Sequence, residues 1–463
     1  MKLKLAASPF RTVSLPMVAM VILMNTARGQ TFYVTNTSNS GPGSLSQAIS
    51  EANNGGGTIL FSNVTGIITM SDTLLTNNIT VDASAVPGGI TINGNHANQI
   101  FYVQSGIVVM TCLTISNGYQ LGGSDDGGAI FNRGSLTMNR CTLSGNSACC
   151  GGNGGGAIAN EGGSLTVNEC TFVGNSTDGY GGGIENIDGI LTVNQCTFSQ
   201  NSCGQGGGGI DTYNYSSSLV LKGTILAGNT ASSSAPDLFM EGGTLTASYC
   251  LIGDGTDSLV TNGVSGNLVG TSAEPINALL GPLGNYGGPT PTMPLTRGSP
   301  AIDAGGTTAF ITDQRGFPRV VGLAPDIGAY ESGTWSNYTI WIWELLPATA
   351  TVIQHAGTFD FDGDGQSNTN EWLAGTDPDN ADSVFRVAEI TRQGSDLLVT
   401  WTMGPGRTNA LQATAGDTRG GYNTNNFSDI FTVTNTVGTT TNYLDTGAAT
   451  NVPARYYRVR LVP

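Results

Sequence analysis

The chain has 463 residues, enough for several domains or for one long repetitive domain with additions. Its 68 glycines are roughly twice the average usage without a collagen-like period, and its 39% hydrophobic content is too high for a disordered acidic chain. The formal net charge of −16 argues against nucleic acids and anionic membranes as partners.

The first 29 residues have the pattern of a secretory signal peptide. Lys2, Lys4 and Arg11 precede the apolar run VSLPMVAMVILM at 13–24, and small residues surround a cleavage site after Gly29. An apolar run of about 12 residues is too short to span a bilayer. The sequence therefore predicts export to the cell surface or the extracellular space, with no membrane span after signal cleavage.

A repeated stretch follows, and its second copy is GGGAIANEGGSLTVNECTFVGN at 154–175. Leu165 and Val167 alternate with polar residues, as do Cys170 and Phe172, so each run predicts a short strand with one buried face. The glycine-rich run supplies a third strand, and asparagines at the ends of the two runs suit the bends. Such a unit cannot bury its apolar face alone, so the repeats must stack. The sequence predicts an all-β fold, a parallel β-helix with three strands per coil.

The cysteines recur with the same repeat. One of them occupies the same place in successive units, and Thr224 fills that place in one unit, which predicts a buried column rather than disulfides; the column is Cys141, Cys170, Cys196 and Cys250. Cys149, Cys150 and Cys203 lie in glycine-rich loops, and the sequence leaves their disulfide state open. At the start of the repeats, SLSQAISEAN at 44–53 places apolar residues on one helical face and predicts an N-terminal cap; these are Leu45, Ala48, Ile49 and Ala52.

Several of these stretches resemble known families. GGAI followed by FVGN or FSQN resembles the polymorphic outer-membrane-protein repeat, and LGPLGNYGGPT…GSPAIDAGG…PDIGAYE at 280–331 resembles the closing block of the choice-of-anchor Q family. The resemblance implies a right-handed parallel β-helix over 30–331, exported to the bacterial envelope or beyond, in a family whose members differ in anchoring. This chain shows neither a sortase signal nor a terminal hydrophobic anchor. Charged residues of the closing block are interpreted as ion pairs that tie the last coil: Asp303, Asp313, Arg315, Arg319, Asp326 and Glu331.

Residues 332–383 contain a candidate calcium loop. Acids at positions 1, 3, 5 and 12 of a loop with glycine at position 6 are typical of a site that wraps oxygen ligands around calcium. The loop resembles those of dockerins and thrombospondin type 3 repeats, and the ion would be structural. Its candidate ligands are Asp360, Asp362, Asp364, Gln366, Asn368 and Glu371. An ordinary solvated acidic linker is the alternative, and Asp377, Asp379 and Asp382 are candidates for a second ion.

The alternating runs within residues 384–463 predict a small antiparallel β-sandwich similar to fibronectin-like modules.

Parallel β-helices also occur in pectin-cleaving enzymes, so an enzyme is the main alternative. Asp125-Asp126 is similar to the paired aspartates of polygalacturonases, but the accompanying HG and RxK motifs are missing. Between residues 30 and 290 only Arg133, Arg140 and Lys222 are basic, which disfavours binding of polyuronates. The acids at 125–126, like Asp178, Glu185, Asp188 and Asp211, are interpreted as solvated loop and edge residues.

The sequence thus favours a non-catalytic scaffold for adhesion or for contact with extracellular glycans or neighbouring cells, with no assigned catalytic residue and with calcium as its one ion. A divergent polysaccharide lyase or glycoside hydrolase is the second hypothesis, and a purely structural envelope protein the third. Ligand identity, anchoring and oligomeric state are left open.

Overall fold

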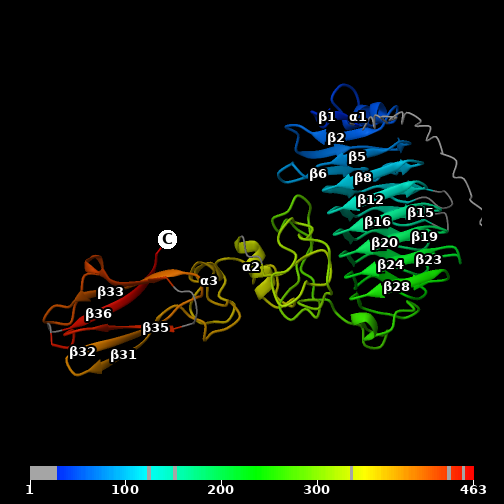
Figure 1. Cartoon of the computed structure of the whole chain (residues 1–463). Coiled ribbons are helices and arrows are strands. Elements are labelled where there is room, and N and C mark those ends of the chain that lie inside the picture. Colours follow the sequence, from blue (N-terminus) through cyan, green and yellow to red (C-terminus); the bar gives the residue numbers. More distant parts are fainter. Residues whose placement is uncertain are drawn as a thin grey trace, which may run out of the picture.

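The computed structural model describes residues 29–121, 127–149, 154–333, 337–434, 440–450 and 454–462 (Figure 1). The expected signal peptide before Gly29, the pair Asp125-Asp126 and Cys150 lie outside these ranges. Within them, no helix is both long enough and apolar enough to cross a membrane. The first strand, β1 (Gln30–Val34), begins directly after the expected cleavage site.

The repeats form a parallel β-helix, as predicted, with each strand hydrogen-bonded to its equivalent in the next coil. Sheet A consists of β1, β2 (Gly57–Phe61), β5 (Ile79–Asp82), β8 (Ile107–Thr111), β12 (Ser135–Asn139), β16 (Ser164–Asn168), β20 (Ile190–Asn194), β24 (Ser218–Lys222) and β28 (Thr244–Ser248). Sheet B consists of β3 (Gly66–Thr69), β6 (Ile90–Asn93), β9 (Leu113–Ser116), β13 (Thr142–Ser144), β17 (Thr171–Val173), β21 (Thr197–Ser199), β25 (Ile225–Leu226), β29 (Leu251–Ile252) and β30 (Leu268–Val269).

Two further sheets complete the coils. Sheet C consists of β4 (Thr73–Leu75), β7 (Phe101–Val103), β11 (Ile130–Asn132), β15 (Ile158–Glu161), β19 (Ile184–Ile187), β23 (Ile210–Tyr213) and β27 (Leu238–Met240). Sheet D is short and adds a fourth strand to the central coils, beyond the three expected from the sequence: β10 (Tyr119–Leu121), β14 (Ser147–Cys149), β18 (Ser176–Thr177), β22 (Ser202–Cys203) and β26 (Thr230–Ala231).

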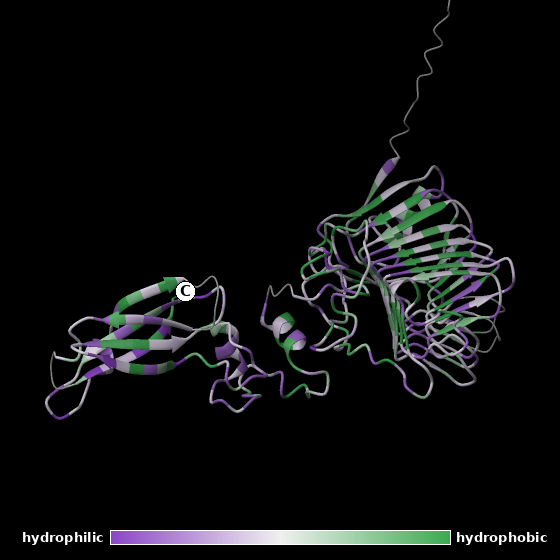
Figure 2. Ribbon diagram, turned by 60° about the horizontal axis from the view of Figure 1, so that its bottom comes forward, coloured by the Kyte–Doolittle hydropathy of each residue, from purple (hydrophilic) through white to green (hydrophobic). Residues whose placement is uncertain are grey.

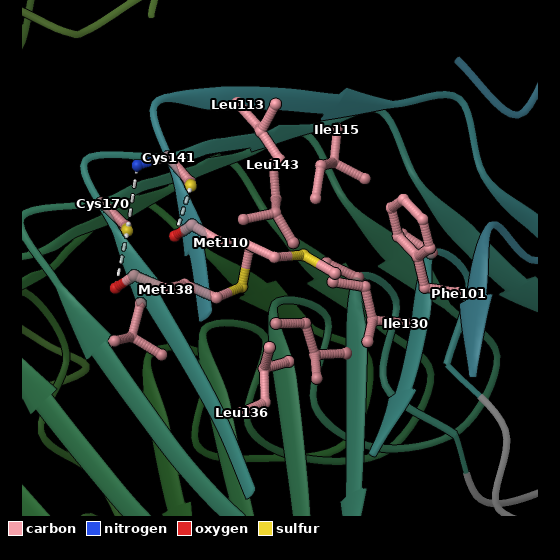
Figure 3. Packing of buried hydrophobic residues seen from close by; sticks show 14 of the residues in the cluster. Phe101, Met110, Leu113, Ile115, Ile130, Leu136, Met138, Cys141, Leu143 and Cys170 are labelled. Carbon is pink, nitrogen blue, oxygen red and sulfur yellow. Dashed lines mark hydrogen bonds between the residues drawn. The ribbon is translucent and has the colours of Figure 1, made fainter. Parts of the chain in front are cut away.

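The inside of the coils is apolar, as the alternation predicts. Figure 2 shows that many residues of the stacked strands are hydrophobic. Leu165 pairs with Leu191 in parallel register, and Phe172 pairs with Phe198. The cysteine column is also confirmed, because its four members are fully buried and their thiols are unoxidised. The backbone N–H of Cys141 donates to Sγ of Cys170 at 3.2 Å, and these two residues lie beside Met110 and Met138 in the core (Figure 3). Burial raises the pKa of Cys170 well above its ordinary value, so the thiol stays protonated.

Asparagine ladders run along the coils where the sequence predicted only bends. Asn175 donates to Oδ1 of Asn201 at 2.8 Å and accepts from Nδ2 of Asn146 at 2.9 Å, and all three are buried. The left-handed bend after sheet A belongs to the residue that follows the expected asparagine, namely Glu169 (φ 52°) and its equivalents Arg140 and Gln195. Asn175 and Asn201 therefore satisfy buried backbone groups from coil to coil. Asn168 bonds to the side chains of Asn139 and Asn194 and does not supply the positive φ itself.

Helix α1 (Leu45–Ala52) covers the N-terminal end of the coils. Its four predicted apolar residues are buried, and Ser44 caps it by accepting from the N–H of Gln47. A 3₁₀ turn at Val264–Gly266 precedes the last strand of sheet B. An uncovered coil end would leave core side chains and strand edges exposed. Helix α1 therefore both seals the core and blocks edge-to-edge association at the N-terminal end.

Residues 280–331 form an irregular block that packs alongside the coils rather than only on the last one. Tyr286, Ile327 and Tyr330 share a buried cluster with Ile225 and Leu251 of sheet B. Thr171 donates to Oε1 of Gln314 at 2.7 Å, which joins the block to the middle of the β-helix. We refer to this segment as the closing block; it lies beside the coils in Figure 1.

Beyond the closing block come two helices and an antiparallel sandwich. Helix α2 (Tyr338–Leu345) packs on α3 (Asn368–Ala374) through Trp341 and Trp372, whose ring centroids are 5.5 Å apart. The sandwich, which the sequence predicted, has two sheets around Trp401. One contains β31 (Val387–Gln393), β32 (Asp396–Thr402) and β35 (Thr440–Asp445); the other contains β34 (Ser428–Thr434), β33 (Thr408–Ala415) and β36 (Arg455–Leu461), with a 3₁₀ turn at Thr424–Asn426.

Candidate functional site

The aspartates of the candidate calcium loop converge. Asp360, Asp362 and Asp364 each offer a carboxylate oxygen within 4.8 Å of the others, and they are the one such group of acids, histidines or cysteines among the described residues. Their other oxygens hold the loop in shape. Asp360 accepts from the N–H groups of Gly363 and Gly365, and Asp364 accepts from the N–H of Gln366 at 2.7 Å. The remaining oxygens, Oδ2 of Asp362 and of Asp364, are buried without a hydrogen-bond donor.

Two residues of α3 that the sequence also offered as ligands carry buried oxygens without donors. The side chain of Asn368 donates to the carbonyls of Gln354 and Ala356, which leaves its Oδ1 buried and without a donor. Glu371 is fully buried in the first turn of α3, outside the 4.8 Å group, and neither of its carboxylate oxygens has a partner. Burial raises the pKa of Glu371 to about 8, and the charges of nearby aspartates, Asp362 first, add to the rise.

These residues fit a calcium ion. Buried acceptors without donors are rare because each costs free energy, and a positively charged ion would supply the partner that these oxygens lack. Carboxylate and amide oxygens in this number are the ligands that calcium prefers. For Gln366 the expected ligand at position 7 is the main-chain carbonyl, and its side-chain Nε2 is buried without an acceptor.

The aspartates considered for a second ion have a different partner. Asp377 accepts from a guanidinium nitrogen of Arg297 at 2.5 Å, and Asp379 accepts from the same guanidinium at 3.4 Å. The arginine already supplies a positive charge there, so these two residues are better explained as an ion pair than as a second calcium site. Since Arg297 belongs to the closing block, this pair joins the block to the loop. On the other side, Arg407 of the sandwich donates to the carbonyl of Trp372 at 2.8 Å.

Four of the six charged residues of the closing block form buried ion pairs, as interpreted from the sequence. Asp303 and Asp326 instead accept hydrogen bonds from backbone N–H groups, so the interpretation is wrong for these two. The side chains of Arg315 and Asp313 are both fully buried, and a guanidinium nitrogen lies 2.7 Å from a carboxylate oxygen. The ring of Tyr330 stacks on the same guanidinium, with its centroid 3.5 Å from Cζ of Arg315. Arg319 pairs with Glu331 at 3.9 Å and also donates to Gln195 on the β-helix. The block is therefore fixed to the outer face of sheet B by polar contacts that are shielded from water.

Two acids expected at solvated edges are buried instead, so that part of the interpretation is wrong. Glu185 of β19 and Asp211 of β23 pair in register on adjacent coils, and each is only 1% exposed. Burial, reinforced by the charge of Glu185, raises the pKa of Asp211 well above its ordinary value. At this exposure no polysaccharide reaches the two carboxyl groups, so their proximity does not make them an acid–base pair for cleavage.

The fold defines a parallel β-helix protein with an appended sandwich. Within it, residues 195–213 match the model of the Chlamydia polymorphic membrane protein repeat. The matched stretch spans β21, β22 and β23 and so covers a large part of one coil. None of the curated proteins matches the chain. The repeat match and the coil agree with a β-helix protein similar to the polymorphic membrane proteins.

Proposed function

We propose that this chain is a surface-exposed bacterial adhesin-like protein whose β-helix acts as a rigid, non-catalytic scaffold. The observation that carries the proposal is the repeat match at 195–213, which falls on a coil of a parallel β-helix. Stacked coils bury one continuous core and present long outer faces, a geometry suited to contact with another surface. The signal-like first 29 residues support export.

The second part of the proposal concerns the candidate calcium loop. In the proposal, Asp360, Asp362, Asp364, Asn368 and Glu371 hold a calcium ion, together with the main-chain carbonyl of Gln366. The ion supplies positive charge to oxygens that otherwise lack partners. Binding to the folded loop alone stabilises it by mass action. Directly after the loop, Trp372 of α3 accepts from Arg407 of the sandwich, and Asp377 pairs with Arg297 of the closing block. The filled loop therefore fixes the position of the sandwich relative to the closing block.

Surface exposure is tested on intact cells of the source bacterium. An antibody raised against the purified chain should bind intact cells, and externally added protease should remove its epitope while a periplasmic marker survives. Cells in which the gene is deleted provide the control for antibody specificity. Binding only after the envelope is permeabilised would overturn the proposed location and, with it, the adhesin role.

A further inference from the structure

Two adjoining cavities form one groove along sheet D. The larger has a volume of about 610 Å³ and lies between the last coils and residues 275–280. The smaller, of about 320 Å³, lies over β14, β18 and β22. Both are lined by Thr230 and Ala231 of β26, so the two cavities adjoin at this strand. A volume of several hundred cubic ångströms is typical of small-molecule sites.

A ladder of hydroxyl groups runs along the groove. Ser147, Ser176, Ser202 and Thr230 occupy equivalent positions on four successive coils. The hydroxyls of Ser176 and Ser147 are 3.0 Å apart, and the strands that carry the ladder repeat at about 4.8 Å. The groove therefore offers hydrogen-bonding groups in a line parallel to the axis of the β-helix, at nearly the repeat of an extended chain of sugar rings.

The wide end of the groove combines apolar and polar walls. Pro236, Pro275, Ile276 and Leu280 line it together with the amide of Asn277. Sugar rings have C–H faces that pack on such apolar groups and hydroxyl edges that need donors and acceptors. The apolar walls thus match the C–H faces of a sugar ring, and the polar walls match its hydroxyl edge.

The charge of the groove limits the ligand further. Asp237, which is 2% exposed, and Asp254 line the wide end, and Asp178 lines the narrow end. No lysine, arginine or histidine is among the described residues that line either part. Carboxylates without cations repel polyanions, so a polyuronate or a sulfated glycan would be disfavoured.

The backbone argues against an extended peptide in this groove. Peptides that dock on sheets add a strand by pairing with a free strand edge. Each inner strand of sheet D already pairs with the coils on both sides, as β18 does with β14 and β22. The remaining hydrogen-bonding capacity of this face belongs to side-chain hydroxyls. Ser176 donates to Ser147, so the hydroxyls of Ser202 and Thr230 and the hydrogen of Ser147 are the groups that suit a ligand rich in hydroxyl groups.

We infer that the groove from Ser147 to Leu280 binds a short neutral oligosaccharide, extended along the axis of the β-helix. The inference rests on the proposed adhesin role and names the ligand class of that role. The hydroxyl ladder contacts the hydroxyl edge of the sugars, and the apolar residues at the wide end contact the ring faces.

The test measures binding by the full chain of short cello-, manno- and chito-oligosaccharides, and of an oligogalacturonate, by titration calorimetry. At least one neutral oligosaccharide should bind, and the oligogalacturonate should not. Thr230→Trp, at the junction of the two cavities, should weaken binding at least about tenfold. Thr246→Trp, on the exposed face of β28 in sheet A, should bind as the wild type does. Thermal unfolding of both variants checks that they are folded.

A second variant removes hydroxyls without adding bulk. Replacement of Ser147, Ser176 and Ser202 by alanine should also weaken binding, because the cavity stays open but loses its polar ladder. The inference is overturned if no neutral oligosaccharide binds, if the uronate or a peptide binds instead, or if Thr230→Trp leaves binding unchanged. Cell attachment that persists in Thr230→Trp would overturn the groove while the adhesin role survives. Loss of surface exposure in the wild type would instead overturn the role itself.

Discussion

The rings of Phe172 and Phe198 lie parallel in the core, with their centroids 4.4 Å apart and their planes at 8°. Both are fully buried and pair in register between β17 and β21. Phe198→Ala should therefore lower the free energy of unfolding by roughly 3–5 kcal/mol, because it leaves a cavity in a close-packed stack. Urea denaturation measures the change. Thr192→Ala, on the outer face of the same coil, should change it by less than about 0.5 kcal/mol, and a similar effect of both substitutions would contradict the assignment of faces.

The asparagine ladder gives a second prediction. Asn175→Ala removes one hydrogen bond of each neighbouring side-chain amide, those of Asn146 and Asn201. It also leaves the backbone N–H of Asn146 without its acceptor and the carbonyl of Leu143 without the Asn175 side-chain donor. We expect a loss of about 1–3 kcal/mol for each buried group left unsatisfied, again measured by urea denaturation. Asn139→Ala, in the half-buried outer ladder, should cost less. Equal costs would mean that the inner ladder is no more important than an exposed one.

The calcium loop gives a third prediction, by limited proteolysis. After chelation, residues 355–383 should become sensitive to protease, because the acids around the loop repel one another without the ion. Asp362→Ala with Asp364→Ala should have the same effect, because it removes two of the proposed ligands. Metal analysis of the wild type should find one calcium per chain. Asp382→Asn, an exposed acid of the same segment, should behave as the wild type does. An unchanged cleavage pattern together with no bound calcium would leave the segment an ordinary acidic linker.

The packing of the closing block should depend on pH. Burial raises the pKa of Glu169 to about 7 and that of Glu331 to about 8. Both values exceed the pKa of a glutamate in an unfolded chain. At pH values between the unfolded and the folded pKa, the folded state therefore binds more protons than the unfolded state does. The free energy of unfolding contributed by these groups is therefore present at low pH and is lost as the pH rises from about 5 to 8.

Thermal unfolding at a series of pH values checks this dependence. The melting temperature should fall across the window, and Glu169→Gln should make the fall shallower because the glutamine does not ionise. Glu51→Gln, an exposed substitution on α1, should leave the slope as it is in the wild type. A wild-type melting temperature that rises steadily from pH 5 to 8 would contradict the account of the buried acids.

Local patterns predicted much of the fold. The alternation of Leu165, Val167 and Phe172 predicted which strand faces are buried, because side-chain direction in a strand has a period of two. The repetition of the unit predicted that the strands stack in parallel. The pattern did not reveal which residue takes the left-handed bend. That position belongs to Glu169, whereas the adjacent asparagine is held by its neighbours in other coils. A ladder between coils depends on stacking register, which one repeat read alone does not contain.

Only part of the candidate site could likewise be predicted from local sequence patterns. The aspartates at 360–364 could be predicted because their spacing alone brings them around one point. The pairing of Arg297 with Asp377 joins residues 80 positions apart, and the contact of Gln314 with Thr171 joins residues 143 apart. Such pairs depend on where the closing block packs. Asp211 is buried beside Glu185 of the preceding coil, and that neighbourhood depends on the stacking register rather than on the local sequence.

The central claim, a non-catalytic adhesive scaffold, is tested most directly by one measurement on beads coated with the purified full chain. The beads are incubated with cells or immobilised glycans, and attachment is counted while the medium is assayed for released reducing or unsaturated sugar ends. The account predicts attachment that soluble chain blocks by competition, with no release of sugar ends above that from uncoated beads. Release of such ends by the coated beads, or no attachment to any surface offered, would contradict it.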